Sequence, residues 1–362
     1  MSGLFIVLTV VLILIVVFQI SRASEYVAVL KGEKKADAQS NQVNAALMIV
    51  FLVLGLIGVY YCNELLKGRM LPEAASIQGK AIDRMMNVTL IITGIVFVIT
   101  QIMLFVFAYR FRATEKRKAY YYPHNNKLEL AWTVVPAIVL TILVAIGLKH
   151  WFSITSDAPK DAMLVEVTGK QFNWMFRYPG KDGVLGKKNY QLVDESKGNM
   201  VGQDWSDPAN HDDVMPNEMH LVVNKPVKLL INSRDVIHDV GLPYFRLKMD
   251  AVPGIPTTMW FTPTITTQEM IKKTGNPNFV YKLVCDQLCG KSHYSMTANI
   301  VVETQEEFDK WIATQPVQYQ LAMSSEAPAG GDSTQAAAPA DSTAAAPAAD
   351  SSVAPADSNA TK

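Results

Sequence analysis

Two cysteines, a histidine and a methionine lie close together near the end of the sequence. Cys285, Cys289, His293 and Met296 all fall in the segment VCDQLCGKSHYSM, residues 284–296. Thiolate, imidazole and thioether groups suit polarisable metals such as copper and zinc better than magnesium or calcium. The spacing therefore predicts a soft-metal site in one short loop, with the rest of its coordination shell supplied from elsewhere in the chain.

Other interpretations of the cysteines remain open at this level. A structural zinc site usually shows two pairs of Cys or His ligands, whereas this sequence has a single cluster. A disulfide between Cys285 and Cys289 would suit an oxidising compartment, but it leaves the spacing of His293 and Met296 without a reason. Cys62 lies in an apolar segment and is predicted to be a buried thiol.

A further ligand is expected from another loop of the same domain. His238, in the segment DVIHDVGLP, follows an expected strand and precedes a Gly/Pro turn. Functional side chains are often carried by loops at the ends of rigid strands. His220 lies inside an expected strand, which favours a structural role. We therefore predict His238 as the distant ligand.

Short segments rich in Val, Ile, Thr and aromatic residues recur between turn residues in this part of the chain. They predict an antiparallel sandwich or barrel, with Asn224-Lys225-Pro226 as a hairpin turn. Thr304 and Glu307 form a capping-box pattern that predicts a short helix after the last strand. The expected strand segments are residues 164–178, 219–232, 257–264, 278–285 and 297–303.

A long polar segment, residues 180–218, separates the first two strand segments. Several of its side chains could hold a cation, but a solvated loop is the favoured interpretation. The candidates are Asp204, Asp207, His211, Asp212 and Asp213.

Composition and four apolar runs indicate a membrane protein. Charged residues make up 18% of the 362 residues, and the formal net charge is zero. Each run has about the 20 residues that a spanning helix needs, and none carries a formal charge. Buried helices of a soluble protein seldom lack all charge, and the first run has no cationic flank typical of a signal peptide. The runs are residues 4–20, 45–62, 88–109 and 130–148.

The distribution of Lys and Arg predicts the orientation. The connection between the third and fourth runs is strongly cationic, which places it in the cytoplasm and everything after residue 150 outside. The tail, from about residue 321, is rich in Ala, Pro, Ser and Asp and is predicted to be disordered. The cations are Arg110, Arg112, Lys116, Arg117, Lys118 and Lys127.

The motif Cys-x3-Cys-x3-His-x2-Met, the segment DVIH and the segment KMDAVPG together resemble the CuA domain of cytochrome c oxidase subunit II. LELAWTVVPAIVLTIL, residues 128–143, resembles that family's second membrane helix, and GKQFNWMFRY, residues 169–178, its aromatic strand. The resemblance covers roughly residues 85–316. It implies transmembrane helices followed by an all-β, cupredoxin-like sandwich that carries a copper site.

The resemblance also implies roles for individual residues. Electrons are expected to enter near Phe172 and Trp174, and Glu129 is expected at the mouth of a proton path. The binuclear copper ligands would be the side chains of His238, Cys285, Cys289, His293 and Met296, with the backbone carbonyl of Gln287.

Three features depart from the family pattern. Gln287 stands where a Glu usually helps to bind magnesium, so that contact is in doubt. Phe172 stands where a Trp is common. The family usually has two membrane helices, whereas four apolar runs occur here, so the first two form an extra hairpin. The expected domains are this extra hairpin (1–63), a family-type hairpin (64–152), the CuA domain (153–320) and the tail (321–362).

The function implied is an electron-accepting subunit of a terminal oxidase in a bacterial inner membrane, with the copper domain on the periplasmic face. The domain shows no constellation for acid, base or nucleophilic catalysis, as suits an electron relay. The resemblance implies that dioxygen reduction, coupled to proton translocation, takes place in a haem-copper partner subunit. No nucleic-acid partner is expected. The donor is expected to be a cytochrome c, or a membrane-attached cytochrome complex, held nearby.

Other functional classes fit the sequence less well. A copper carrier of the nitrous-oxide-reductase type would lack the membrane hairpin, and a membrane-tethered copper chaperone would alternate helix and strand. A quinol-oxidase subunit would lack the copper ligands. A fused haem c domain is excluded because no Cys-x2-Cys-His motif occurs.

Overall fold

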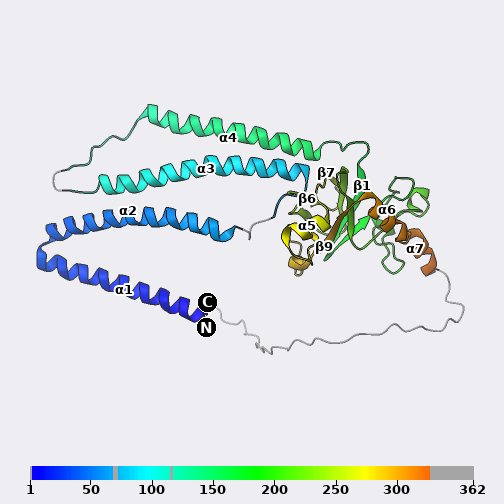
Figure 1. Cartoon of the computed structure of the whole chain (residues 1–362), viewed down its shortest axis with the longest axis horizontal. Coiled ribbons are helices and arrows are strands. Elements are labelled where there is room, and N and C mark those ends of the chain that lie inside the picture. The colour runs from blue at the N-terminus through cyan, green and yellow to red at the C-terminus, as the bar shows by residue number, and fades with distance from the viewer. Residues whose placement is uncertain (1, 68–71, 115–116, 327–362) are drawn as a thin grey trace, which may run out of the picture. The chain divides into compact units, whose positions relative to one another are not determined.

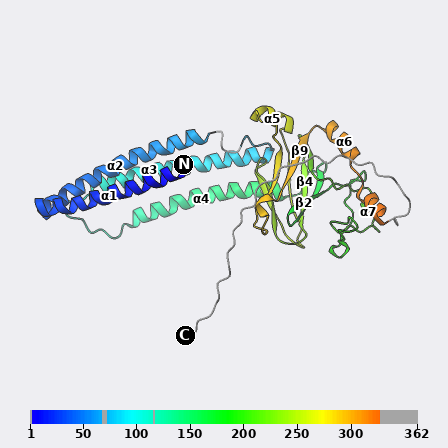
Figure 2. The ribbon, with the colours of Figure 1, turned by 90° about the horizontal axis from the view of Figure 1, so that it is seen from below.

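The structure is a computed structural model that describes residues 2–67, 72–114 and 117–326. Four long helices come first, and each is long and apolar enough to cross a membrane, which confirms that the four predicted apolar runs are helical. Each helix contacts the next one along the chain (Figure 1, Figure 2). They are α1 (Ser2–Lys31), α2 (Glu33–Leu66), α3 (Ile77–Arg110) and α4 (Asn126–Thr155).

These helices extend beyond the apolar runs. Helix α2, for example, begins at Glu33, well before the apolar run at residue 45, because polar residues with good helix propensity continue the helix into the expected interface. Cys62 lies near the end of α2 and is exposed in this chain. The prediction of a buried thiol was therefore wrong.

Hydrogen bonds and an ion pair connect the start of α3 to the β-domain. The hydroxyl of Ser76 caps the helix by accepting from the Gly79 N–H at 2.8 Å, and it donates to the Phe245 carbonyl at 2.8 Å. Arg246 pairs with Asp83 on the next turn, with 2.9 Å between Nε and Oδ1. These contacts join the membrane hairpin to the domain that carries the predicted metal ligands.

The domain is a sandwich of two sheets. One has the order β2-β1-β4-β7 and the other the order β3-β9-β8-β5-β6. The strands of the first are β1 (Met163–Lys170), β2 (Asn173–Arg177), β4 (Val227–Ser233) and β7 (Thr257–Phe261). Those of the second are β3 (Met219–Val222), β5 (His238–Leu242), β6 (Leu247–Ala251), β8 (Tyr281–Cys285) and β9 (Thr297–Glu303).

Alternating side chains from both sheets fill the space between them. Val165, Leu229 and Leu283 are fully buried there, and each buried aliphatic side chain stabilises the fold by about 1.5–3 kcal/mol. The sandwich prediction is thus confirmed.

Three details of the strand prediction were wrong. The sheets are mixed, because β1 runs parallel to β4 and β3 parallel to β9. Asn224-Lys225-Pro226 is not a hairpin turn, since the strands on either side of it, β3 and β4, lie in different sheets. The predicted first strand segment is itself a hairpin, in which β1 and β2 turn at Gln171 and Phe172. Local turn signals cannot show which sheet the next strand will join.

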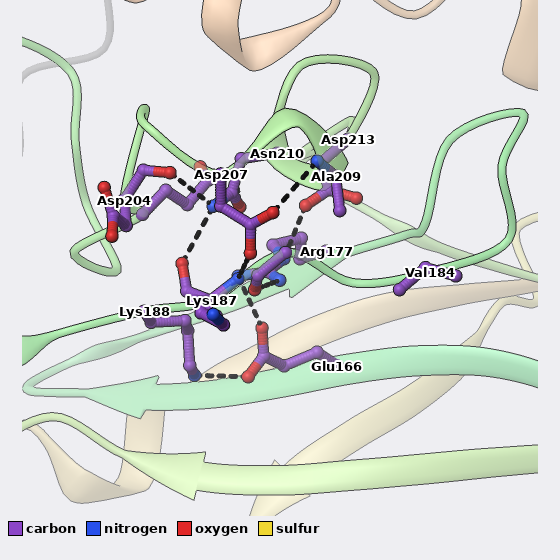
Figure 3. A network of polar contacts seen from close by, with 12 residues as sticks. Glu166, Arg177, Val184, Lys187, Lys188, Asp204, Asp207, Ala209, Asn210 and Asp213 are labelled. Carbon is purple, nitrogen blue, oxygen red and sulfur yellow. Dashed lines mark hydrogen bonds and ion pairs between the residues drawn. The ribbon is translucent and has the colours of Figure 1, made fainter.

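Residues 180–218 form an ordered loop over the first sheet (Figure 3). Arg177 is buried and pairs with Glu166 at 3.3 Å and with Asp213 at 3.1 Å. Asp207 accepts the N–H groups of Lys187 and Ala209. The favoured interpretation of a solvated loop was therefore wrong for Asp213, which has no exposed surface.

Short helices flank the sandwich. The predicted capping box at Thr304 and Glu307 is present and starts α6 (Gln305–Thr314). Residues 321–326 are helical, because α7 spans Gln318–Glu326; the rest of the predicted disordered tail lies outside the described residues. The other short elements are α5 (Thr267–Thr274), η1 (Tyr190–Leu192), η2 (Pro208–Asn210) and η3 (His293–Ser295).

Candidate metal centre

The predicted ligands are carried by two neighbouring strands and the loop that follows them. His238 is the first residue of β5 and Cys285 is the last residue of β8. These strands are antiparallel, with Val240 opposite Cys285. The loop after β8 carries Cys289, places His293 on η3 and returns at Met296 to β9. Strand register therefore brings His238 to the cluster across 47 residues of sequence.

Four further donor groups surround the two thiols. The Sγ atoms of Cys285 and Cys289 lie 3.8 Å apart. Near Cys285 Sγ are His238 Nδ1 at 3.8 Å and the Gln287 carbonyl oxygen at 3.2 Å. Near Cys289 Sγ are His293 Nδ1 at 3.6 Å and Met296 Sδ at 3.8 Å. The structure thus brings together all six predicted ligands.

The two cysteines are free thiols. A disulfide would hold the sulfurs about 2.05 Å apart, so the disulfide interpretation was wrong. Burial, reinforced by the neighbouring Cys285 thiol, raises the pKa of Cys289 to about 11. A bound cation would favour the thiolate form and release the proton. The donor set of two sulfurs, two imidazoles and a thioether fits a soft metal.

The ring of His238 is held from its far side. Its Nε2 lies 2.8 Å from Asp235 Oδ1, which leaves Nδ1 facing the thiols. The other oxygen, Asp235 Oδ2, accepts the Gln171 N–H at 2.7 Å. Burial raises the pKa of Asp235, but these hydrogen bonds outweigh it and hold that pKa below its ordinary value. A carboxylate behind a ligand imidazole fixes the orientation of the ring.

The two aromatic residues that the resemblance selected lie beside the centre. Trp174 is buried, with its ring centroid 5.9 Å from that of His238, and its Nε1–H donates to the Met296 carbonyl at 3.4 Å. Phe172 lies half-buried at the tip between β1 and β2, against Gly290 of the ligand loop. Phe172 therefore lies nearer the surface and Trp174 beneath it.

The remaining predicted residues lie elsewhere. The Gln287 side chain is exposed, and Glu129 is on α4, where its carboxylate accepts the Asn125 N–H at 3.3 Å. His220 stacks on Trp311 and pairs with Glu303 at 2.8 Å, as expected of a structural residue. Within the described ranges, one group of three or more His, Cys, Asp or Glu side chains lies close enough together to share an ion. It consists of His238, Cys285 and Cys289.

Two residues of the site were not predicted. Asp235 and Gln171 contact the ligands but carry no pattern of their own in the sequence. The usable signal for Asp235 is its place three residues before a ligand histidine. For Gln171 no local signal exists, because its contact with the loop spans 118 residues.

The fold and site define a membrane-anchored, cupredoxin-like protein with a candidate metal centre. Residues 64–149 match the family described as cytochrome c oxidase subunit II, transmembrane domain, and residues 163–305 match its periplasmic domain. The chain belongs to the cytochrome c oxidase subunit II family. It is an electron-accepting subunit of a cytochrome c oxidase, and residues 1–63 lie outside the region that the family matches.

Two relatives agree with this assignment. An alternative cytochrome c oxidase subunit 2 from Bradyrhizobium diazoefficiens is 37% identical over 65% of this chain and 80% of its own length. A cytochrome c oxidase subunit 2 from Thermostichus vulcanus is 28% identical over 68% and 81%. The periplasmic domain of subunit II from Bradyrhizobium japonicum aligns with 29% identity and a TM-score of 0.30, covering 45% of this chain and 98% of that one.

Proposed function

We propose that His238, Cys285, Cys289, His293, Met296 and the Gln287 carbonyl hold a binuclear copper centre. The observation that supports this is the pair of free thiols 3.8 Å apart, with an imidazole beside each. Such a centre supplies one-electron transfer with little change in ligand geometry, because two thiolates share the charge between two ions. The chain's own contribution is to bury these donors and hold them rigidly.

The surroundings of the ligands support the proposed relay. Electrons would enter at the half-buried Phe172, with Trp174 beneath it in contact with the ligand His238. Met296 and His238 have no exposed surface, so water is kept from those donors. We propose that the electrons pass to haem in the catalytic subunit, where dioxygen is reduced to water with proton translocation.

The other partners and the location follow from the family. We propose a bacterial inner membrane, with this domain on the periplasmic face, other oxidase subunits as neighbours and a cytochrome c or a membrane-bound cytochrome as donor. The proposed boundaries are the hairpin 1–63, the family hairpin 64–152, the copper domain 153–320 and the tail 321–362. At a magnesium site on the interface with the catalytic subunit, the uncharged Gln287 would bind the ion more weakly than the family's Glu does.

Copper loading of the full chain tests the central proposal. We expect two copper ions per chain and a mixed-valence EPR spectrum, because both thiolates are needed to bridge the ions. Cys289→Ser should leave at most one copper and remove that spectrum. Cys62→Ser, which changes the exposed cysteine of α2, is the matched control and should leave both unchanged. A Cys289→Ser protein that kept the two-copper spectrum would show the assignment to be wrong.

A further inference from the structure

A chain of three hydrogen bonds joins ligands that come from separate parts of the fold. His238 Nε2 lies 2.8 Å from Asp235 Oδ1, and the Gln171 N–H donates to Asp235 Oδ2 at 2.7 Å. The Gln171 side chain then donates from Nε2 to the Cys289 carbonyl at 2.5 Å. Gln171, at the tip between β1 and β2, thus bonds both to Asp235, which holds the ring of His238, and to the backbone of Cys289.

We propose that Gln171 is a positioning residue that fixes the Cys289 loop relative to His238. This inference rests on the proposed copper function. His238 begins β5 whereas Cys289 lies in the loop after β8, so the backbone of that loop can shift without breaking the strand pairing. The side-chain amide of Gln171 links the Cys289 loop to the first sheet. The backbone N–H of Gln171 links the same residue to Asp235.

The packing of the ligand loop on this tip supports the role. Gly290, directly after Cys289, has φ +135°, and a Cβ there would come within 2.9 Å of Gln171 Nε2 and 3.0 Å of Phe172 Cζ. Only glycine tolerates both that backbone conformation and so close an approach. The loop therefore rests directly against Gln171 and Phe172.

The role differs from ordinary stabilisation of the core. Gln171 lies at the surface, so its side chain contributes little to the interior of the sandwich. Groups that hold metal ligands in place typically change metal affinity about 10–100-fold when they are removed. The amide should therefore matter to the metal centre far more than to folding.

The first test uses Gln171→Met in the full chain loaded with copper. Methionine keeps the length and bulk of glutamine but lacks the N–H donor. We expect roughly tenfold faster copper release to a chelator and a changed EPR hyperfine pattern, with the unfolding midpoint of the metal-free protein unchanged. Gln191→Met is the matched control, because Gln191 is an exposed glutamine of the same domain whose side-chain amide donates to the Tyr190 hydroxyl at 3.4 Å and not to the ligand loop. It should leave all three measurements unchanged.

A double-mutant cycle tests the connection through Asp235. Asp235→Asn removes the carboxylate behind His238, and we expect its effect on copper release to be non-additive with that of Gln171→Met because both act on one connected unit. Additive effects would overturn the inference, as would a Gln171→Met protein that matches wild type in release and EPR. If wild type itself fails to bind two copper ions, the proposed function is wrong instead, so the two failures are distinguishable.

Discussion

At the scale of single residues, the most unusual environment outside the metal centre is that of Asp213. Its carboxylate has no exposed surface and faces Arg177, whose charge is already shared with Glu166 (Figure 3). Burial raises the pKa of Asp213 to about 6, although the Arg177 charge opposes the shift. Removing charges from water is costly, and pairing offsets the cost only in part.

This raised pKa predicts how stability depends on pH. An unfolded Asp ionises near pH 3.9, so between about pH 4 and 6 the folded chain binds more protons than the unfolded chain. The contribution of Asp213 to the free energy of unfolding is then fully present below pH 4. It is lost as the pH rises through 6, by roughly 3 kcal/mol at most.

Thermal unfolding followed by tryptophan fluorescence measures the effect. Asp213→Asn cannot ionise, so the melting temperature of wild type relative to this variant should fall by several degrees between pH 4 and 7. Parallel pH profiles for the two proteins would contradict the prediction.

At the scale of elements, Glu129 at the N-terminus of α4 has two candidate roles, capping the helix and carrying protons. The Asn125 side chain accepts the Leu128 N–H at 3.1 Å, and Glu129 accepts the Asn125 N–H at 3.3 Å. A carboxylate at a helix N-terminus is also stabilised by the helix dipole. Glu129 therefore caps α4, whether or not it also lies on the proposed proton path.

Two substitutions separate these roles. Glu129→Gln keeps an oxygen that accepts the Asn125 N–H but removes the ionisable carboxyl group, whereas Glu129→Ala removes both. If Glu129 lies on the proton path, both variants of the assembled oxidase should slow oxygen consumption several-fold, with the copper spectrum unchanged. Slow turnover in the Ala variant with normal turnover in the Gln variant would assign Glu129 to capping alone.

At the scale of the whole molecule, four membrane helices and one β-domain require a definite orientation. An even number of spans puts the two ends of the membrane region on the same side. The cationic connection between α3 and α4 favours the cytoplasm. A reporter enzyme fused at residue 120 should therefore be active only inside the cell, and one fused near residue 325 only outside. Activity of both fusions on one side would remove α4 as a spanning helix.

The charges around the proposed point of electron entry bear on the donor. Lys170, beside the tip of the β1–β2 hairpin, pairs with Glu195 at 2.8 Å. At the other end of the hairpin, Lys188 pairs with Glu166, and Arg177 with Glu166 and Asp213. Such pairing leaves little net field to steer a charged protein from solution. We expect the donor to be held at the membrane.

A salt series with the purified oxidase checks this expectation. Oxidation of a soluble cationic cytochrome c should be slow and should change little with ionic strength. A fast rate that falls steeply with salt, and that collapses in Phe172→Ala, would instead show that a soluble donor is captured by charge.

The sequence by itself determined the parts of this protein that depend on local pattern. Four apolar runs marked the membrane helices, Thr304 and Glu307 marked the start of α6, and the spacing of Cys285, Cys289, His293 and Met296 marked the metal loop. In each case the residues that interact are close in sequence, or the membrane selects them by composition alone.

Only the tertiary structure decided which distant residues meet. The register of β5 with β8 brings His238 to the thiols, the tip between β1 and β2 brings Gln171 to Cys289, and the ordered loop buries Asp213 against Arg177. The sequence also did not predict the crossing from β3 to β4 or the parallel strand pairs. Contacts of this kind depend on how strands are ordered and registered in two sheets, and no short stretch of sequence encodes that order.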